Sequence, residues 1–579
     1  MSWSRRSALL LLLTFVSFPL TAVSRPACAR PALRGSFLQP DLGDEWTIKQ
    51  WQKELSYMGR AGIDQMVIQW TADSKYKTTI YPSGLAGYTQ NTKHDVVERA
   101  LRTADENGAQ VFLGLQNNDD WWKKYANDPA WLKKQAKVAN ELADDLWKRY
   151  HAHQSLAGWY LVFEVDNWNE ATQTEWNRLD DFFQTTANHL HKLTPGKPVM
   201  IAPFFNPSGG LTSAQWKAMW EYILSRSPLD ILAQQDGVGV GHATTKQLPE
   251  WFSAVREAIR NARPQMKFWV DSETFNGDGE PMVIHKLVKD MRAVQPYVSS
   301  YLSFSFNHYM SPQQVNPLYY KTYMDYLATG RVESEPPTKP SGLKAVPLDS
   351  MTISLSWKAS TDNFGVAGYK IWRDEKRVAT LYDRETGFVD SELEPNTTYT
   401  YQVAAFDAAG NQSALSDPAT ATTPPADKYK TDLALGKPYT ATMAADPNYP
   451  DTGGIELTDG IYGTIDYTDP AWQGRNTDQT YSFTIDLGAV QDIKELRSRW
   501  LQYQSVGIFL PKQVTYSVSA DNVNFTVIGT VKKPAVGHEN LPAWYTLTNL
   551  SNVSGRYVKV EVTPPSSTWT FIDEAEARQ

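Results

Sequence analysis

Two pairs of carboxylates have the spacing that places both side chains on one side of a β-strand. Glu164 and Asp166 follow the apolar stretch GWYLVF, and Asp271 and Glu273 end the stretch KFWVDSE. Side chains two residues apart on a strand point the same way. Two carboxyl groups that meet in one cleft can cleave a glycosidic bond. One protonates the leaving oxygen, while the other attacks the anomeric carbon or activates water.

Polar and aromatic side chains follow the other apolar stretches of the first 330 residues in the same way. Amides, carboxylates and aromatic rings suit a ligand rich in hydroxyl groups. We therefore expect substrate contacts from Gln39, Trp70, Asn117, Asp166, Asn206, Gln234, Asp236, Asp271, Asn307 and His308, and stacking from Trp121, Trp122, Trp168, Phe204, Phe205 and Tyr309. The alternative is structural: such carboxylates and amides also fix loops through hydrogen bonds.

The elements that must position these residues alternate between strand and helix. Apolar runs predict strands at 35–39, 65–70, 110–115, 158–164, 198–203, 230–234, 267–273 and 300–306, and amphipathic stretches predict helices at 48–61, 130–150, 174–193 and 245–262. Eight such units over residues 31–330 are typical of a (β/α)8 (TIM) barrel, whose active site lies at the carboxyl ends of the strands. A doubly wound open sheet is disfavoured because no glycine-rich phosphate motif follows any strand.

The rest of the chain predicts two β-sandwiches behind a linker. Residues 331–340 are rich in proline and charge, which is typical of a linker. Residues 341–424 contain GYKIWRD and TTYTYQVAAFDAAGNQSALS and resemble fibronectin type III domains, with Trp357, Tyr369, Leu393 and Tyr401 at the core positions. The resemblance implies a structural spacer.

Residues 430–579 contain LALGKPYTA, YSFTIDLG, VTYSVSADNVNF, GRYVKVEV and FIDEAEA. In order and spacing these segments resemble the coagulation factor 5/8 C-terminal (discoidin) domains, a group that includes the carbohydrate-binding modules of family 32. The resemblance implies a discoidin-like jelly roll. It also implies sugar contacts among Tyr467, Trp472, Arg475, Trp500 and Tyr503, although Trp500 could equally belong to the core.

The segment ADPNYPDTGGIELTDG resembles the calcium loop of the discoidin-type modules. The resemblance implies a structural calcium ion near Glu456, Asp459 and Glu574, because carboxylate and backbone oxygens are the ligands of this hard cation. A plain turn of aspartate and glycine residues is the alternative. No cofactor is expected for catalysis, since the sequence has no HExxH or CxxC spacing.

The segments GWYLVFEVDNWN, ILAQQDGVGVG and FWVDSETF resemble an uncharacterised bacterial barrel family related to retaining glycoside hydrolases. In the largest clan of those hydrolases the acid/base glutamate follows strand four and the nucleophile follows strand seven. The resemblance therefore implies that Glu164 is the acid/base and Glu273 the nucleophile. Phe163 stands where the clan has asparagine, which leaves Asp166 as a rival to Glu164. Asp236 could instead act as the base of an inverting enzyme.

We therefore predict a secreted glycoside hydrolase that acts on a polysaccharide or surface glycan and is targeted by its C-terminal carbohydrate-binding domain. The alternatives are a non-catalytic glycan-binding or adhesin-like protein, and a polysaccharide lyase with Asp236 or His308 as base. The absence of a GxSxG motif disfavours a serine esterase. A formal charge of −8 without a basic cluster argues against a nucleic-acid partner.

The first 29 residues have the organisation of a signal peptide. Arg5 and Arg6 precede an apolar run, and Ala27-Cys28-Ala29 has the form of a cleavage site, which predicts secretion or export to the periplasm. A lipid anchor at Cys28 is less favoured, because Arg25-Pro26 precedes it. No later stretch is apolar enough for a transmembrane segment. We expect a monomer.

Overall fold

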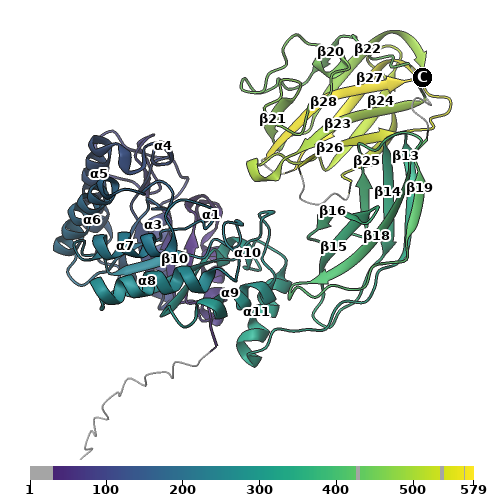
Figure 1. Ribbon diagram of the computed structural model, residues 1–579. Helices are drawn as coiled ribbons and strands as arrows, with labels where there is room; N and C mark the ends of the chain where they lie inside the picture. The colour runs from purple at the N-terminus through teal and green to yellow at the C-terminus, as the bar shows by residue number, and fades with distance from the viewer. Residues whose placement is uncertain (1–29, 425–428, 430, 535–539, 566–567) are drawn as a thin grey trace, which may run out of the picture.

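Three modules follow one another along an arc in the computed structural model, which describes residues 30–424, 429, 431–534, 540–565 and 568–579 (Figure 1). A helix-covered sheet comes first, and two β-sandwiches follow it. The predicted fold class is therefore confirmed. The predicted signal peptide lies outside the described residues.

Eight parallel strands form the sheet of the first module. In spatial order they are β1 (Gly35–Leu38), β2 (Gln65–Ile68), β6 (Gln110–Gly114), β8 (Leu156–Leu161), β9 (Val199–Ile201), β10 (Ile231–Gln235), β11 (Lys267–Glu273) and β12 (Ser300–Phe304). The backbone N–H of Arg34, just before β1, donates to the carbonyl of Tyr301 in β12 over 2.8 Å. The first and last strands thus meet, and the sheet curls into a nearly closed barrel.

Helices cover the outside of this barrel (Figure 1). They are α1 (Pro40–Glu45), α2 (Ile48–Arg60), α3 (Val96–Asn107), α4 (Trp121–Lys124), α5 (Pro129–Tyr150), α6 (Gln173–Leu193), α7 (Ser213–Leu224), α8 (Leu248–Ala262), α9 (Ile284–Val294), α10 (Phe306–Tyr309) and α11 (Pro317–Thr329). Local signals set their ends: Thr47 and Gln50 form a capping box at α2, and α3 ends at Gly108 with φ of 66°. A small second sheet joins β3 (Ala72–Asp73), β4 (Thr78–Thr79), β5 (Thr89–Gln90) and β7 (Gln116–Asn117) beside the strand ends.

Each barrel strand presents one face to the helices and the other to the barrel interior. The interior layer includes Phe37, Val67, Phe112, Tyr160, Met200, Ile231, Ala233, Trp269 and Leu302. Because side chains alternate along a strand, the residues two and four positions after Trp269 also face the interior. These residues are Asp271 and Glu273, so the alternation carries both carboxylates to the mouth of the barrel.

The second module is a sandwich of two antiparallel sheets. One contains β13 (Ser341–Asp349), β14 (Thr352–Lys358) and β17 (Gly387–Asp390), and the other contains β15 (Val366–Arg373), β16 (Lys376–Leu381), β18 (Thr398–Asp407) and β19 (Ala419–Thr422). The predicted core residues Trp357, Tyr369, Leu393 and Tyr401 are all buried between them. Leu318 and Tyr319 of α11 pack against Phe406 of this module, which joins it to the barrel.

The third module is also a sandwich of two antiparallel sheets. One sheet contains β20 (Tyr439–Ala441), β22 (Tyr481–Asp492), β24 (Gln513–Ser519), β25 (Thr526–Lys532) and β27 (Ser554–Thr563), and the other contains β21 (Gln473–Thr477), β23 (Glu495–Gln502), β26 (Leu541–Leu547) and β28 (Thr568–Arg578). Buried aliphatic and aromatic side chains from both sheets fill the space between them.

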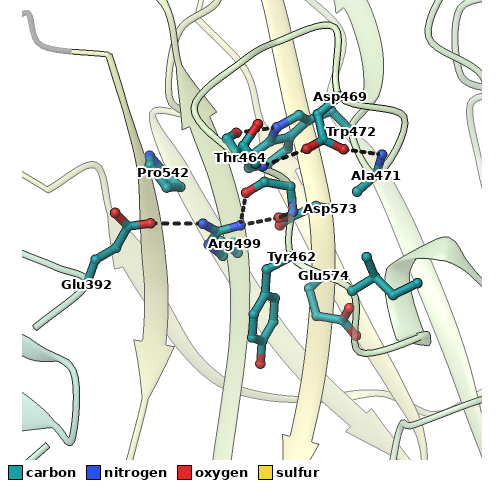
Figure 2. Close-up of polar contacts among 12 residues, drawn as sticks. Glu392, Tyr462, Thr464, Asp469, Ala471, Trp472, Arg499, Pro542, Asp573 and Glu574 are labelled. Carbon is teal, nitrogen blue, oxygen red and sulfur yellow. Dashed lines mark hydrogen bonds and ion pairs between the residues drawn. The ribbon is translucent and has the colours of Figure 1, made fainter. Parts of the chain in front are cut away.

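Arg499 joins the third module to the second (Figure 2). It forms an ion pair with Asp573, which is fully buried, and donates to Glu392 of the second module over 3.0 Å. Ser391 also donates its hydroxyl to the carbonyl of Pro542 over 3.1 Å. The joint between the two sandwiches is therefore made by specific polar contacts.

Candidate active site

Glu273 is the last residue of β11 and is only 5% exposed. Burial raises the pKa of its carboxyl group to about 7, although hydrogen bonds from the backbone N–H groups of Val240 and Gly239 oppose the rise. The N–H of Val240 donates to Oε2 over 2.8 Å. The loop after β10 thus holds Glu273 in one orientation and favours its ionised form.

Gly239 allows that loop to approach so closely. A Cβ atom at this position would lie 2.4 Å from the carbonyl oxygen of Phe275 and 2.9 Å from Cβ of Glu273. Real Cβ atoms essentially never make contacts this short, so any larger residue at position 239 would displace the backbone. The sequence motif GVGVG is therefore part of the support of Glu273.

Glu164 lies three residues beyond β8 and is partly exposed at the barrel mouth. The predicted strand 158–164 is too long at this end, because β8 stops at Leu161. Burial raises the pKa of Glu164 to about 7, with smaller contributions from the charges of Glu273 and Asp166, while a hydrogen bond from Gln235 lowers it. The charge of Glu273 thus acts on Glu164, so the two carboxyl groups lie in one electrostatic environment.

Asp236 and Asp271 lie in the same environment, and each is 2% exposed. Burial and the nearby charge of Glu273 raise the pKa of both carboxyl groups well above their ordinary value. Asp236 accepts hydrogen bonds at Oδ1 from the backbone N–H groups of Val238, over 3.1 Å, and Glu273, over 3.5 Å. Through these two bonds Asp236 positions both the loop after β10 and the end of β11.

Asp166 and Asn206 fix loops beside the mouth. Asp166 accepts hydrogen bonds from the backbone N–H groups of Trp168 and Asn169, each over 2.7 Å. Asn206 accepts at its side chain from the N–H of Ser208 and at its carbonyl from the indole of Trp168. These bonds leave the Trp168 ring 49% exposed, so both residues orient a surface that can stack on a sugar.

Gln234 and Asn307 do not reach the mouth, and the predicted substrate contacts at these two positions are wrong. Gln234 faces α7 and accepts a hydrogen bond from the indole of Trp216 over 3.2 Å. Asn307 is fully buried and donates to Glu54 of α2 over 2.8 Å. The missed residue is Gln235, which lies on the interior face of β10 and contacts Glu164. The alternation set by Ile231 and Ala233 could have identified it.

The remaining predicted contacts are partly exposed: Gln39, Trp70 and Asn117 lie at strand ends, and His308 lies in α10. Burial lowers the pKa of His308, so this residue is neutral at pH 7, and its Nε2 atom has no hydrogen-bond partner among the described residues. A neutral imidazole can donate to or accept from a hydroxyl group.

The predicted stacking residues fall into two groups. Trp121 and Phe205 are buried in the core, which corrects the prediction for both. Exposed or partly exposed rings at the mouth are those of Trp122, Trp168, Phe204 and Tyr309, together with His242, whose ring lies 5.7 Å from that of Phe204. His242 was missed, because a single histidine in a glycine-rich loop carries no distinguishing sequence signal.

The three predicted calcium ligands hold turns of the third module. Glu456 accepts from the N–H of Thr452 over 2.8 Å, Asp459 from Ile461 over 2.8 Å, and Glu574 from Gly460 over 3.1 Å. Burial and the charges of Glu576 and Asp459 raise the pKa of Glu574, drawn in Figure 2, to about 9.

One buried carboxylate oxygen of Glu456 and one of Glu574 have no hydrogen-bond partner among the described residues, which suits a hard cation. Within the same residues, however, no three His, Cys, Asp or Glu side chains form a group that could hold a metal ion. Further ligands would have to be backbone oxygens. Calcium binding stays a prediction, which thermal unfolding with and without a chelator would test.

Some of the predicted sugar contacts of the third module are buried, and others are partly exposed. Trp472 and Arg475 are buried, which corrects the prediction for both, and Trp500 belongs to the core, the alternative that the sequence left open. Tyr467 and Tyr503 are partly exposed and pack with Tyr449 and Trp569 in one aromatic cluster. These rings can still offer a face to a ligand.

Comparison with known families assigns each module. Residues 33–316 match the family described as Domain of unknown function (DUF4434), residues 338–422 match the fibronectin type III domain, and residues 440–575 match the F5/8 type C domain. Within the described part of the chain, no helix is both long and apolar enough to cross a membrane.

Individual relatives share parts of the chain. An alpha-amylase of Niallia circulans is 44% identical over 16% of this chain and 7% of its own length. The protein YbcH of Escherichia coli is 24% identical over 38% of this chain and 71% of its own length. A structure assigned as an alpha-L-fucosidase of Bacteroides thetaiotaomicron is 22% identical, with a TM-score of 0.43, over 51% of this chain and 96% of that one. The chain spans no more than 17% of the length of the first curated relatives it matches.

Proposed function

We propose that this chain, in which a DUF4434 barrel precedes a fibronectin type III domain and an F5/8 type C domain, is an exported glycoside hydrolase. It would cleave O-glycosidic bonds of a polysaccharide or surface glycan. The observation that carries the proposal is the pair Glu164 and Glu273, which share one barrel mouth and both have a pKa of about 7. A pair with one proton supplies an acid and a nucleophile together.

The surroundings of the two carboxyl groups favour different roles. Glu273 receives two backbone hydrogen bonds, which stabilise its ionised form, so it is the nucleophile. Glu164 is nearer to solvent and is the acid. In the first step Glu273 bonds to the anomeric carbon while Glu164 gives its proton to the departing glycosidic oxygen. In the second step Glu164 takes a proton from water, and the water oxygen replaces Glu273.

The raised pKa values of Asp236 and Asp271 support this division. If both were ionised, they would add negative charge beside Glu273 and raise its pKa further. A raised pKa favours the neutral form of each aspartate, which lowers the negative charge beside Glu164 and Glu273. This arrangement also disfavours Asp236 as the base of an inverting hydrolase or a lyase, because that role needs the ionised carboxylate.

The C-terminal domain would bring the catalytic barrel to its substrate. A weak glycan-binding domain that is tethered to a catalytic domain raises the effective substrate concentration at an extended surface. The stretch shared with an alpha-amylase supports a role in polysaccharide degradation.

Aryl glycosides with good leaving groups test the two roles separately. Such a leaving group departs without protonation, so Glu164→Gln should keep much of its activity on an aryl glycoside and lose it on an oligosaccharide. Glu273→Gln should lose both activities. Glu141→Gln, at an exposed position of α5, is the matched control. Loss of both activities in Glu164→Gln, or retention of either in Glu273→Gln, would contradict the assignment.

A further inference from the structure

A cavity of about 690 Å³ lies where the three modules meet. Its walls come from residues 275–280 after β11, from Thr380 of β16 and Tyr382 just after that strand, and from Gln504, Phe509 and Asn540 of the F5/8 domain. This volume falls within the ~300–1,000 Å³ of typical ligand pockets. No single module could form this cavity by itself.

The cavity borders the loop that holds Glu273, the proposed nucleophile. Val240 lines it, and the backbone N–H of the same residue donates to Glu273. Phe275, another lining residue, follows Glu273 by two positions and packs its ring 5.3 Å from that of Tyr309 at the barrel mouth. The cavity therefore adjoins the loop and the strand end that hold Glu273.

Hydrogen bonds between modules fix one wall. The hydroxyl group of Tyr382 accepts from Nδ2 of Asn276 over 2.9 Å and donates to Oδ2 of Asp278 over 3.0 Å. The loop after β11 is also closed by the bridge between Phe275 and Pro281. This wall is ordered before any ligand binds, which lowers the entropic cost of binding.

The lining indicates the ligand. Phe275, Tyr382 and Phe509 offer aromatic rings, while amide and carboxylate groups offer hydrogen-bond partners for hydroxyl groups. Among the described residues that line the cavity there is no Lys, Arg or His, whereas Asp278 and Glu280 are acidic. This composition disfavours uronic and sulfated sugars, because their charges would meet carboxylates.

We propose that the cavity is a distal subsite for a glycan chain without negative charge, which extends from the catalytic carboxylates to the F5/8 domain. The inference rests on the proposed function, because the direction of the chain is set by its cleavage point at Glu273. The cavity thereby makes the fibronectin type III and F5/8 domains parts of the substrate cleft.

The test is a titration of the full chain carrying Glu273→Gln, which binds without turnover. The probes are cello-oligosaccharides, chito-oligosaccharides and glucosamine oligomers, each from disaccharide to octasaccharide, with oligogalacturonides as the acidic series. We expect affinity to rise with length in at least one of the first three series. Adding Phe509→Ala should weaken the longest oligomer about tenfold, the loss expected for a buried aromatic contact, and leave the disaccharide unchanged.

Gln504→Ala is a smaller change and should lower the affinity for the longest oligomer severalfold. It replaces Phe509→Ala in the test if that variant fails to fold. Phe525→Ala, in the same domain but away from the cavity, is the control and should change nothing. The proposal is overturned if length has no effect, if both cavity variants bind like the control, if only the acidic series binds, or if no probe binds. The proposed function fails separately, if the chain with native Glu273 releases no product from any glycan.

Discussion

The backbone N–H of Val240 donates to Oε2 of Glu273 over 2.8 Å, so a loop that follows one strand sets the ionisation of a carboxyl group on the next. Gly239 lets the loop come this close. We expect Gly239→Ala to push the loop away, to raise the pKa of Glu273 further and to lower kcat by up to about 100-fold, the scale of a 1 Å misplacement.

The measurement for Gly239→Ala is a pH–rate profile, whose acid limb should move to higher pH. Gly59→Ala in α2 is the control, because an added Cβ there meets nothing within 4 Å. An unchanged profile in Gly239→Ala would show that the loop does not tune Glu273.

The pH dependence of kcat/KM should be bell-shaped with its maximum near pH 7. The active form has Glu164 protonated and Glu273 ionised, and both have a pKa of about 7. As pH falls, Glu273 gains a proton and the reaction slows; as pH rises, Glu164 loses its proton and the reaction slows again. On an aryl glycoside the alkaline limb should weaken. A flat rate between pH 5 and pH 9 would contradict this assignment.

Glu273→Gln should stabilise the fold at alkaline pH and leave it unchanged in acid. The folded-state pKa of about 7 lies above the ordinary 4.5, so the folded state holds this proton more tightly. The stability associated with the proton is fully present below pH 4.5 and is lost as pH rises through 7. Glutamine removes that loss, which is on the order of 3 kcal/mol.

Chemical denaturation at pH 4 and pH 8 measures this effect, with Glu141→Gln as the exposed control. If Glu273→Gln is less stable than the native chain at pH 8, the pKa of Glu273 is not raised in the folded state.

Asn307→Ala should affect stability and not substrate binding. The amide of Asn307 donates to Glu54 and accepts from the hydroxyl of Ser36, each over 2.8 Å, in a fully buried position. Alanine would leave both groups without this partner, at a cost of about 2–4 kcal/mol. The KM of the remaining folded protein should not change. A raised KM at native stability would return Asn307 to the substrate site.

Strand alternation made much of the candidate site predictable. In KFWVDSE, Trp269 must face the interior, so Asp271 and Glu273 follow it to the mouth. At β10 the prediction failed because the strand ends one residue later than expected. Gln235, not Gln234, therefore faces the barrel interior at the strand end. At β8 the chain leaves the sheet early, and the ring of Phe163 stacks on Trp121 at 5.1 Å.

Contacts between distant segments were not predictable. Nothing near Asn307 in the sequence indicates that its hydrogen-bond partner will be Glu54 of α2. The buried state of Trp472 and Trp500 also depends on which sheet covers them. The cavity between the modules depends on how three separately folded domains meet, and no local pattern encodes that arrangement.

Product analysis against a broad polysaccharide panel tests the central claim most directly, with the native chain compared with Glu164→Gln and Glu273→Gln. We expect at least one glycan to be shortened by the native chain and left intact by both variants, with binding to that glycan retained. If the native chain binds a glycan and releases no product from any member of the panel, the barrel is a binding module and the account is wrong.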